Sequence, residues 1–531
     1  MTFATSYHPA TETGTVEQMT VGDLLQRCAE ESPDRTALVA FNDSGERSTW
    51  TYAELYAEAK QVACALLARF QPGDHVAIWS PNRYEWTLLE FGAALAGLVI
   101  VTVNPALLRD EVRYVLGQSK AKGLFLVERH RDNPMLDHIE SLRGELPALR
   151  DVVRFDEWDQ FLAGAVECEL PSVKPDQPAQ VQYTSGTTGF PKGAMLRHLS
   201  IVNNARFQGA RMGVSGEDVV LNYMPLFHTG GCVNGTLIPA AYGAAQVLLP
   251  GFTANSALDA LESEQCTVVG GVTTMYIMML EEASFSSRDL STLRVGWTGG
   301  STVPASLVRQ IEERFGIALT IVFGQTETSP TITQTTLDDS SKDKSETVGR
   351  PLPWTEVKII DPDSGATLPV GEAGELCTRG YLTMLGYFEL PEATAETIDE
   401  EGWLHTGDLC AMDERGYFSV RGRIRDMIKR GGENIYPAEI EGVLAEHPDV
   451  IDAAVVGVPD PRWSEQPAAF VRLAEGATVT EEDLFSFLRE RLASHKTPRV
   501  WRFTNTFPTT PSGKIQKFVL REQLISELPQ D

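Results

Sequence analysis

The chain has 531 residues, 42% of them hydrophobic and 22% charged, which is ordinary for a globular enzyme. This length predicts three or four folding units, since one hydrophobic core serves roughly 150 residues. The net charge of −28 argues against nucleic acid or an anionic membrane as a general partner. Any anionic ligand must therefore be held by local basic residues.

The beginning of the chain predicts neither a secretory signal nor a transmembrane segment. The first twenty residues contain no lysine or arginine and no long apolar run. Residues 91–103, the most apolar stretch, are too short to span a bilayer and predict a buried helix followed by a strand. The seven cysteines lack metal-like spacing, so we expect reduced thiols that fill the core of a cytoplasmic protein.

From about residue 74, short β-rich runs alternate with helical patterns. Unbroken apolar strands separated by helices predict an α/β fold with parallel sheets covered on both faces. The predicted strands are residues 75–79, 123–127, 246–249, 266–269, 293–297 and 319–323.

A run of small and hydroxylated residues directly follows another predicted strand, in VQYTSGTTGFPKGAM, residues 181–195. Close glycines let backbone N–H groups approach phosphate oxygens, while hydroxyls and a lysine add donors and charge. Most such runs are surface loops, but this one begins at a hydrophobic strand. The chain has no GxxxxGK[ST] pattern, which disfavours an ordinary P-loop NTPase. The candidate phosphate-binding residues are Thr184, Ser185, Gly186, Thr187, Thr188, Gly189 and Lys192.

Other predicted strands also end in glycines or polar residues. LNYMPLFHTGG, residues 221–231, places His228 beyond one strand, and GWTGGSTVP, residues 296–304, places Gly299, Gly300 and Ser301 beyond another. Open α/β sheets bind ligands at the carboxyl ends of their strands, so these segments predict a single crevice. A lone histidine after a strand is more often structural, which is the alternative for His228.

The last hundred or so residues predict a separate α+β unit. A helix begins at Pro437, and strands follow at residues 450–458 and 468–473. Thr480 caps a further helix with an acidic first turn. The predicted joint to the rest of the chain is the basic stretch 421–432.

Four further motifs each have an ordinary explanation when taken alone. Thr326 of FGQTET can cap a helix, and Asp408 of GWLHTGDL can sit in a turn. The basic residues of GRIRDMIKRGGENIYPAEIE can form a solvated charge run, and Lys514 of TPSGKIQK can be a solvated lysine. These motifs begin at residues 323, 402, 422 and 510, in that order.

Together with YTSGTTGFPKG, these motifs resemble those of the adenylate-forming superfamily in composition and order. That group contains acyl-CoA ligases, luciferases and the adenylation domains of peptide synthetases. The resemblance extends from Tyr183 to Lys517. It implies a large N-terminal domain, residues 1–424, with parallel-rich sheets and the ATP and acyl sites, and a small mobile α+β domain, residues 425–531.

The resemblance also implies roles for the residues of the nucleotide site. Phe323 would stack on adenine, with backbone from Gly300 and Ser301 beside it. Thr326 would contact phosphate, and Glu327 would bind Mg²⁺, a hard cation that prefers oxygen ligands. The remaining members of the implied ATP site are Gly324, Gln325, Lys514, and the ribose ligands Asp408 and Arg423.

For catalysis and CoA binding, the resemblance implies a mobile lysine and a hinge. Lys514 would bridge the acid's carboxylate and the α-phosphate, because each close contact of like charges costs a few kcal/mol at an effective dielectric near ~20. Arg425 would be the hinge, where many relatives carry Asp or Lys. Lys429, Gly431 and Gly432 would line the CoA side. Thr229, Gly230 and Gly299 would surround the acyl group beside His228, which we also count as catalytic.

The predicted activity is an ATP- and Mg²⁺-dependent acid:CoA ligase acting through an acyl-adenylate, with a medium- or long-chain fatty acid as substrate. An aryl, alicyclic or steroid-side-chain acid is the alternative substrate. Oxygenation or loading of a carrier protein is the alternative second step, and a non-catalytic nucleotide-binding protein is the alternative class. The partners are small molecules, and the sequence leaves open whether the chain forms a homodimer.

Overall fold

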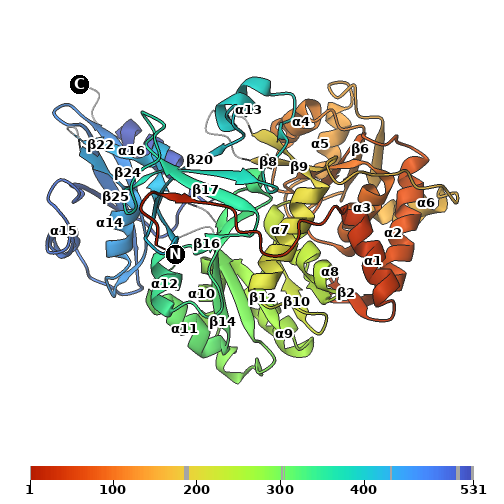
Figure 1. The fold of residues 1–531 in the computed structure, drawn as a ribbon, viewed down its shortest axis with the longest axis horizontal. Helices are drawn as coiled ribbons and strands as arrows, with labels where there is room; N and C mark the ends of the chain where they lie inside the picture. Colours follow the sequence, from red (N-terminus) through yellow and green to blue (C-terminus); the bar gives the residue numbers. More distant parts are fainter. Residues whose placement is uncertain are drawn as a thin grey trace.

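In a computed structural model of the chain, the structure describes residues 2–184, 191–299, 303, 305–430, 433–509 and 515–527. Within these residues the strands form four sheets, of seven, nine, five and five strands. In Figure 1 the seven-stranded sheet and its helices α2–α6 lie at one end of the molecule, and the C-terminal sheet lies at the other.

The seven-stranded sheet has the order β19-β9-β8-β5-β4-β6-β7. The strands from β8 to β7 are parallel, and β9 and β19 add an antiparallel edge. Every residue of β5 is buried, as expected for a strand with both faces covered. The strands are β4 (His75–Trp79), β5 (Val99–Val103), β6 (Gly123–Leu126), β7 (Asp151–Arg154), β8 (Pro178–Thr184), β9 (Lys192–Arg197) and β19 (Gly386–Tyr387). The helices are α2 (Tyr52–Leu67), α3 (Tyr84–Ala96), α4 (Arg109–Gln118), α5 (Met135–Leu142), the 3₁₀ turn η1 (Phe155–Glu157) and α6 (Trp158–Ala163).

The nine-stranded sheet has the order β16-β15-β14-β13-β12-β10-β11-β2-β3 and is parallel from β14 to β2. Its strands are β2 (Thr36–Phe41), β3 (Arg47–Thr51), β10 (Val219–Asn222), β11 (Ala245–Leu248), β12 (Val268–Val272), β13 (Val295–Gly299), β14 (Ala318–Gly324), β15 (Thr331–Gln334) and β16 (Arg350–Pro351). The accompanying helices are α1 (Val21–Glu31), α7 (His198–Arg211), the π-helix η2 (Gly230–Leu237), α8 (Ile238–Tyr242), α9 (Ala254–Ser263), α10 (Thr273–Glu281), η3 (Phe285–Ser287), α11 (Ala305–Phe315), η4 (Thr326–Thr328) and α12 (Ser341–Glu346).

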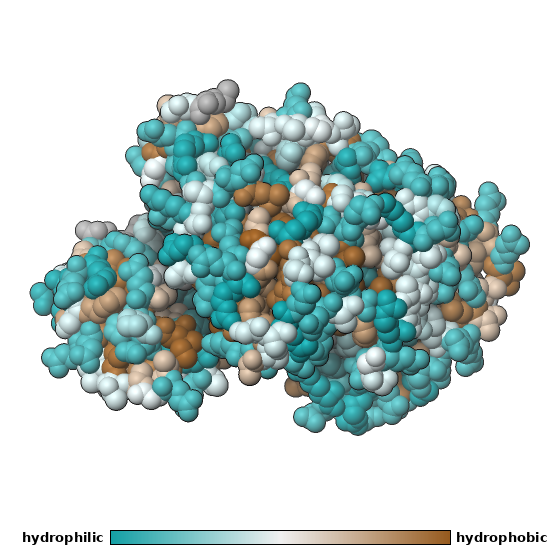
Figure 2. All heavy atoms as spheres, turned by 90° about the horizontal axis from the view of Figure 1, so that it is seen from below, coloured by the Kyte–Doolittle hydropathy of each residue, from teal (hydrophilic) through white to brown (hydrophobic). Residues whose placement is uncertain are grey.

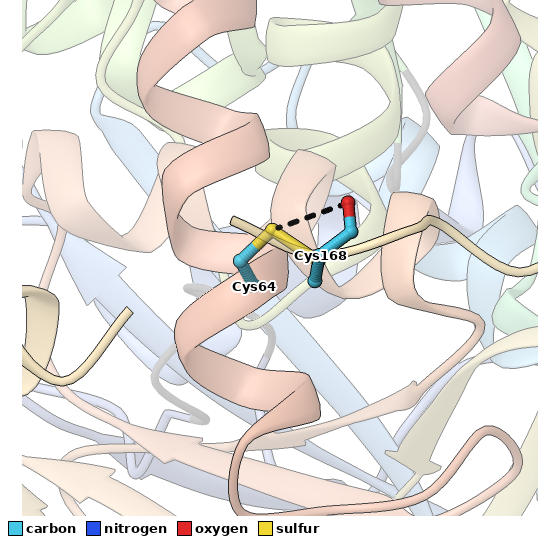
Figure 3. Close-up of a disulfide and its surroundings, with 2 residues drawn as sticks. All are labelled: Cys64 and Cys168. Atoms are coloured by element: carbon cyan, nitrogen blue, oxygen red, sulfur yellow. Dashed lines mark hydrogen bonds between the residues drawn. A yellow bond between two sulfur atoms is a disulfide. The ribbon is translucent and has the colours of Figure 1, made fainter. Parts of the chain in front are cut away.

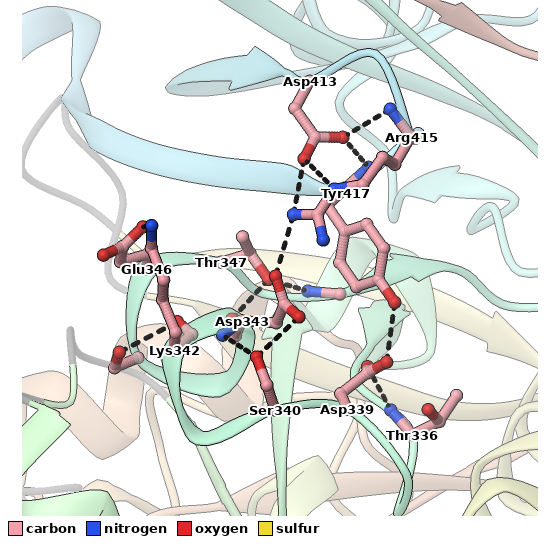
Figure 4. Close-up of polar contacts among 12 residues, drawn as sticks. Thr336, Asp339, Ser340, Lys342, Asp343, Glu346, Thr347, Asp413, Arg415 and Tyr417 are labelled. Atoms are coloured by element: carbon pink, nitrogen blue, oxygen red, sulfur yellow. Dashed lines mark hydrogen bonds and ion pairs between the residues drawn. The ribbon is translucent and has the colours of Figure 1, made fainter. Parts of the chain in front are cut away.

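An antiparallel sheet follows, to which the N-terminal segment contributes the edge strand β1. Its strands are β1 (Tyr7–His8), β17 (Thr355–Ile360), β18 (Gly374–Gly380), β20 (Leu404–Met412) and β21 (Phe418–Arg423), accompanied by α13 (Pro391–Thr397) and η5 (Ile424–Asp426). Figure 4 shows how the β20–β21 hairpin is fixed to the α12 region. Arg415 pairs with Asp413 and Asp343, at 2.8 Å each, and Tyr417 donates a hydrogen bond to Asp339 at 2.6 Å.

The fourth sheet consists of strands that all begin beyond residue 427. It has hydrophobic clusters of its own, which agrees with the predicted α+β unit. The boundary between residues 424 and 425 stays a prediction. The elements are β22 (Ile428–Arg430), β23 (Glu433–Ile435), α14 (Pro437–Leu444), β24 (Val450–Asp460), β25 (Ser464–Leu473), α15 (Glu481–Arg489), β26 (Val500–Phe503) and α16 (Lys517–Glu527).

The predicted strands are present, with ends displaced by up to four residues. Residues 91–103 form the end of α3 and then β5, and Thr480 caps α15 by accepting a hydrogen bond from the Asp483 N–H. None of the helices that the structure describes is long and apolar enough to cross a membrane. The face in Figure 2 is mostly hydrophilic, with hydrophobic residues in small separate groups.

The expectation that all seven cysteines are reduced is wrong for one pair. Cys64 on α2 forms a disulfide with Cys168, in the segment that leads from α6 to β8 (Figure 3). The two residues are 104 positions apart, so no local spacing pattern in the sequence indicated the pairing. The other five cysteines are free and buried, as expected of thiols that fill the core.

Candidate active site

Parallel strands bring several predicted residues to one edge of the nine-stranded sheet. β14, β13, β12 and β10 are neighbours in that order, and they end at Gly324, Gly299, Val272 and Asn222. A β-carbon on Gly299 would lie 2.4 Å from the Val322 carbonyl oxygen, and one on Gly324 would lie 2.0 Å from a carbonyl oxygen on the neighbouring strand segment. Both positions therefore require glycine, because only glycine permits so close an approach of backbone.

Glu327 joins this edge to the seven-stranded sheet. Its Oε1 accepts a hydrogen bond from the Tyr387 hydroxyl at 2.7 Å and lies 3.4 Å from the Thr184 hydroxyl, which donates to it. Thr184 ends β8, and Tyr387 lies on β19, so both partners belong to the other sheet. Residues 143 positions apart in the chain thus meet at one carboxylate oxygen. We call Thr184, Lys192, Glu327 and Tyr387 the Glu327 cluster.

The Glu327 cluster contains a buried carboxylate and carries both signs of charge. Glu327 is only 8% exposed. The Lys192 ammonium lies 5.2 Å from the centre of the Tyr387 ring, within reach of a cation–π interaction. Burial and, after it, the Glu327 carboxylate raise the pKa of Tyr387, so its hydroxyl stays protonated and donates.

The donor atoms of this cluster suit a hard cation beside phosphate. Glu327 offers a carboxylate and Thr184 a hydroxyl, and oxygen ligands of this kind are those that Mg²⁺ prefers. Thr326, the preceding residue, is 9% exposed and begins η4. Lys192 supplies a positive charge on the other strand of the β8–β9 pair. The residues present therefore fit a Mg²⁺ ion held together with a polyanion.

Asp408 and Arg423 form a second charged pair, on the antiparallel sheet. They are cross-strand partners on β20 and β21, and the Arg423 Nε lies 2.9 Å from Asp408 Oδ1. Asp408 is only 4% exposed, so a guanidinium partner offsets the cost of burying its charge. Phe323, at the end of β14, packs against a hydrophobic cluster that includes Cys410 and Phe418 of these two strands. Residues of both sheets therefore share one hydrophobic cluster, against which Phe323 packs.

The predicted acyl residues lie just after β10. The His228 Nδ1 accepts a hydrogen bond from the Gly230 N–H at 3.1 Å, which fixes the ring at the start of η2. Thr229 is 1% exposed, and its hydroxyl has no hydrogen-bond partner among the described residues. A buried hydroxyl of this kind costs free energy unless a ligand or water satisfies it.

The predicted hinge and CoA residues in the described chain are exposed. Arg425 lies on η5, with its Nε 3.7 Å from Asp426 and its side chain 48% exposed. Lys429 is exposed on β22, and its backbone N–H donates to Glu465 at 2.9 Å. The other predicted site residues lie outside the described residues: Ser185, Gly186, Thr187, Thr188, Gly189, Gly300, Ser301, Gly431, Gly432 and Lys514.

Tyr387 is a member of the Glu327 cluster that the sequence did not indicate. It lies on a strand of two residues, too short to show the alternation that marks longer strands. The glycine that precedes it, Gly386, was a weak signal in the sequence. In the structure its φ is +132°, which residues other than glycine rarely adopt. Pairing with β9 carries the tyrosine to Lys192.

Comparisons with known proteins find family models and relatives that match most of the chain. Residues 25–388 match the family model described as AMP-binding enzyme, and residues 439–514 match the AMP-binding enzyme C-terminal domain. The chain is 41% identical to the putative acyl-CoA synthetase YngI of Bacillus subtilis, over 95% of this chain and 97% of the relative. It is 38% identical to the mitochondrial medium-chain acyl-CoA ligase ACSF2 of Danio rerio, over 99% of this chain and 92% of the relative.

A solved structure shows the same architecture over nearly the whole chain. The ATP-bound MatB of Rhodopseudomonas palustris superposes with a TM-score of 0.86 and 30% sequence identity. The match covers 96% of this chain and all of the other.

Proposed function

This chain belongs to the AMP-binding enzyme family, in its acyl-CoA synthetase branch, and we propose that its substrate is a medium- or long-chain fatty acid. It is an AMP-forming acid–thiol ligase that uses ATP, Mg²⁺ and CoA. The acid's carboxylate attacks the α-phosphorus of ATP, which releases pyrophosphate and leaves an acyl-adenylate. The CoA thiol then attacks the acyl carbon, AMP leaves, and the thiol proton passes to solvent.

The observation that carries the proposed site is the meeting of Thr184 and Glu327 across two sheets. In the proposal the phosphate loop, residues 184–189, and Lys192 hold the phosphates, and Thr326 contacts them beside Glu327. Glu327 holds Mg²⁺, which offsets the negative charge of the phosphates when bound. Tyr387 keeps the Glu327 carboxylate in place by its 2.7 Å hydrogen bond.

The rest of the nucleotide is assigned to residues of β14, β20 and β21 and to the segment that follows β13. Phe323, with Gly300, Ser301, Gly324 and Gln325, takes the adenine end. Asp408 takes the ribose hydroxyls, and Arg423 holds its carboxylate in position at 2.9 Å. Phe323 packs against a hydrophobic cluster that also contains Cys410, two residues from Asp408, and this supports the placement of both ends on one nucleotide.

The second half-reaction is assigned to the C-terminal unit, residues 425–531. Lys514 brings positive charge to the reacting carboxylate and α-phosphate, where charge builds up during adenylation. Rotation about Arg425 then withdraws Lys514 and brings Lys429, Gly431 and Gly432 to the site for CoA. The exposure of Arg425 supports a hinge there, since few contacts would be broken.

The assignment of a medium- or long-chain acid rests on the relatives and on small residues near His228. ACSF2 is named a medium-chain acyl-CoA ligase, and 38% identity over 99% of this chain makes a similar acid the first choice. Thr229, Gly230 and Gly299 are small residues, and the proposal places the apolar chain of the acid beside them and His228. The proposed compartment is the cytoplasm, which supplies ATP and CoA.

A screen of acids with the purified full-length chain tests this proposal. AMP release is measured with ATP, Mg²⁺ and CoA over straight-chain acids from short to long, aryl acids and steroid-side-chain acids. We expect kcat/KM to peak on the medium or long straight-chain acids. A peak on an aryl or steroid-side-chain acid would overturn the assigned substrate but not the ligase activity. AMP release that is undiminished without CoA would overturn CoA as the acceptor.

A further inference from the structure

A group of potential metal ligands lies on the antiparallel sheet, apart from the residues assigned above. Cys377 on β18 is the cross-strand partner of His405 on β20. Glu375 precedes Cys377 by two residues on the same strand, so both side chains lie on one face of the sheet. Their ligand atoms and a His405 nitrogen all lie within 4.8 Å of one another.

His405 stands between the other two side chains. Its Nδ1 lies 2.8 Å from Glu375 Oε2 and 3.5 Å from Cys377 Sγ. Zinc is bound by Cys, His and carboxylate at about 2.0–2.3 Å, and tetrahedral geometry then places the nitrogen and sulfur about 3.5 Å apart. The nitrogen–sulfur separation already has this value. The histidine–glutamate hydrogen bond would have to lengthen by about half an ångström.

Neighbouring polar groups orient His405 and Glu375, as the hydrogen-bond partners of metal ligands do in known metal sites. The other ring nitrogen, Nε2, lies 3.6 Å from Asp399, and a carboxylate near that nitrogen orients metal-binding histidines. The Glu375 Oε1 accepts a hydrogen bond from the Gly407 N–H at 3.0 Å. Lys358, the neighbouring cation on β17, lies over the Trp403 ring at 4.3 Å. Cation–π attraction thus holds that charge at the ring.

Burial and exposure are arranged as a metal site requires. Cys377 is fully buried, whereas the side chains of His405 and Glu375 are 28% and 13% exposed, which leaves a route from solvent. All five free cysteines lie in the described part of the chain, and Cys377 is the one grouped with a histidine and a carboxylate there.

We propose that Cys377, His405 and Glu375 bind a thiophilic divalent metal, with Zn²⁺ as the favoured ion. Binding displaces the thiol proton to solvent and leaves a fourth position for water. The ion would clamp β18 to β20 three residues before Asp408. This site is independent of the proposed substrate and of Glu327, whose oxygen ligands suit Mg²⁺ instead.

Cobalt binding tests the proposal, since Co²⁺ bound to a thiolate absorbs in the near ultraviolet and, when tetrahedral, in the visible. Metal-free full-length chain is titrated with Co²⁺ and then with Zn²⁺. We compare Cys377→Ala with the matched control Cys410→Ala, which removes another fully buried free thiol of the same sheet. His405→Gln is a second test, in case loss of the Cys377 side chain prevents folding.

We expect one Co²⁺ per chain with a thiolate band, displaced by one Zn²⁺, in the wild type and in Cys410→Ala. Cys377→Ala should lose the band, and both site variants should bind Zn²⁺ at least about tenfold more weakly. Zn²⁺ should raise the melting temperature of the wild type but not of the site variants. Absence of a thiolate band in the wild type, or equal zinc affinity in the site variants and the control, overturns the proposal.

Discussion

At the scale of single residues, the Glu327 cluster depends on hydrogen bonds to one buried carboxylate oxygen. Tyr387→Phe removes the 2.7 Å bond to Glu327 and keeps the ring over which Lys192 lies. A hydrogen bond to a charged group contributes about 1.5–3 kcal/mol, so we expect kcat/KM for Mg·ATP to fall about tenfold to a hundredfold. Steady-state kinetics at varied Mg²⁺ concentration measure this fall in kcat/KM.

The control for this change is Tyr52→Phe, which removes a buried hydroxyl that donates to the Ala244 carbonyl oxygen at 2.6 Å. It should lower stability by about 1 kcal/mol and leave the Mg²⁺ dependence unchanged. If Tyr387→Phe behaves like Tyr52→Phe, the cluster does not position Glu327 for catalysis.

A second prediction at this scale concerns His198, which is 1% exposed. Its Nδ1 accepts a hydrogen bond from the Val21 N–H at 3.3 Å, and burial lowers its pKa to about 4. The unfolded chain therefore binds a proton at higher pH than the folded chain. This contribution to stability is complete above about pH 6.5 and is lost as the pH falls from there toward 4.

The loss of unfolding free energy attributable to His198 should reach about 3 kcal/mol, since each pKa unit corresponds to about 1.4 kcal/mol. Urea unfolding at several pH values measures it in the wild type and in His198→Gln, which cannot take up the proton. The wild type should lose more stability than the variant between pH 6.5 and 4. Parallel curves for the two proteins would contradict the prediction.

At the scale of elements, the sequence predicted the apolar strands of the parallel sheets and missed most strands of the antiparallel sheet that contains β20. The apolar runs that became β4 and β14 were found because at least three buried residues stand together in each. β19 was missed because it has two residues and is defined by its pairing with β9. The disulfide was missed for the same reason, since it joins α2 to a segment 104 residues away.

The disulfide between Cys64 and Cys168 leaves five free thiols in the chain. Alkylation of the denatured chain without reductant should label five thiols, and alkylation after reduction should label all seven. Intact mass measures both. A loop of about a hundred residues predicts roughly 4–5 kcal/mol of stabilisation in the chain-entropy model, lost on reduction. Seven labels without reductant would show that Cys64 and Cys168 are not joined.

At the scale of the whole molecule, the fold works by bringing strand ends from separate sheets to one place. The sequence indicated this because parallel strands end in glycines and polar residues on one edge of a sheet. It could not indicate that Thr184 and Glu327 share a contact, because that depends on how two sheets pack. The sequence determines the identity of the acid substrate less well still. One methylene changes the free energy of discrimination between two substrates by only about 1–3 kcal/mol.

The central claim is that Glu327 and its neighbours form the Mg²⁺–nucleotide site of an adenylating enzyme. Acid-dependent exchange of pyrophosphate into ATP reports adenylation alone and needs no CoA. We compare the wild type, Glu327→Gln and the control Glu346→Gln, whose side chain is 63% exposed on α12. We predict exchange in the wild type and the control, and a loss of about a hundredfold or more in Glu327→Gln. Undiminished exchange in Glu327→Gln would contradict the account.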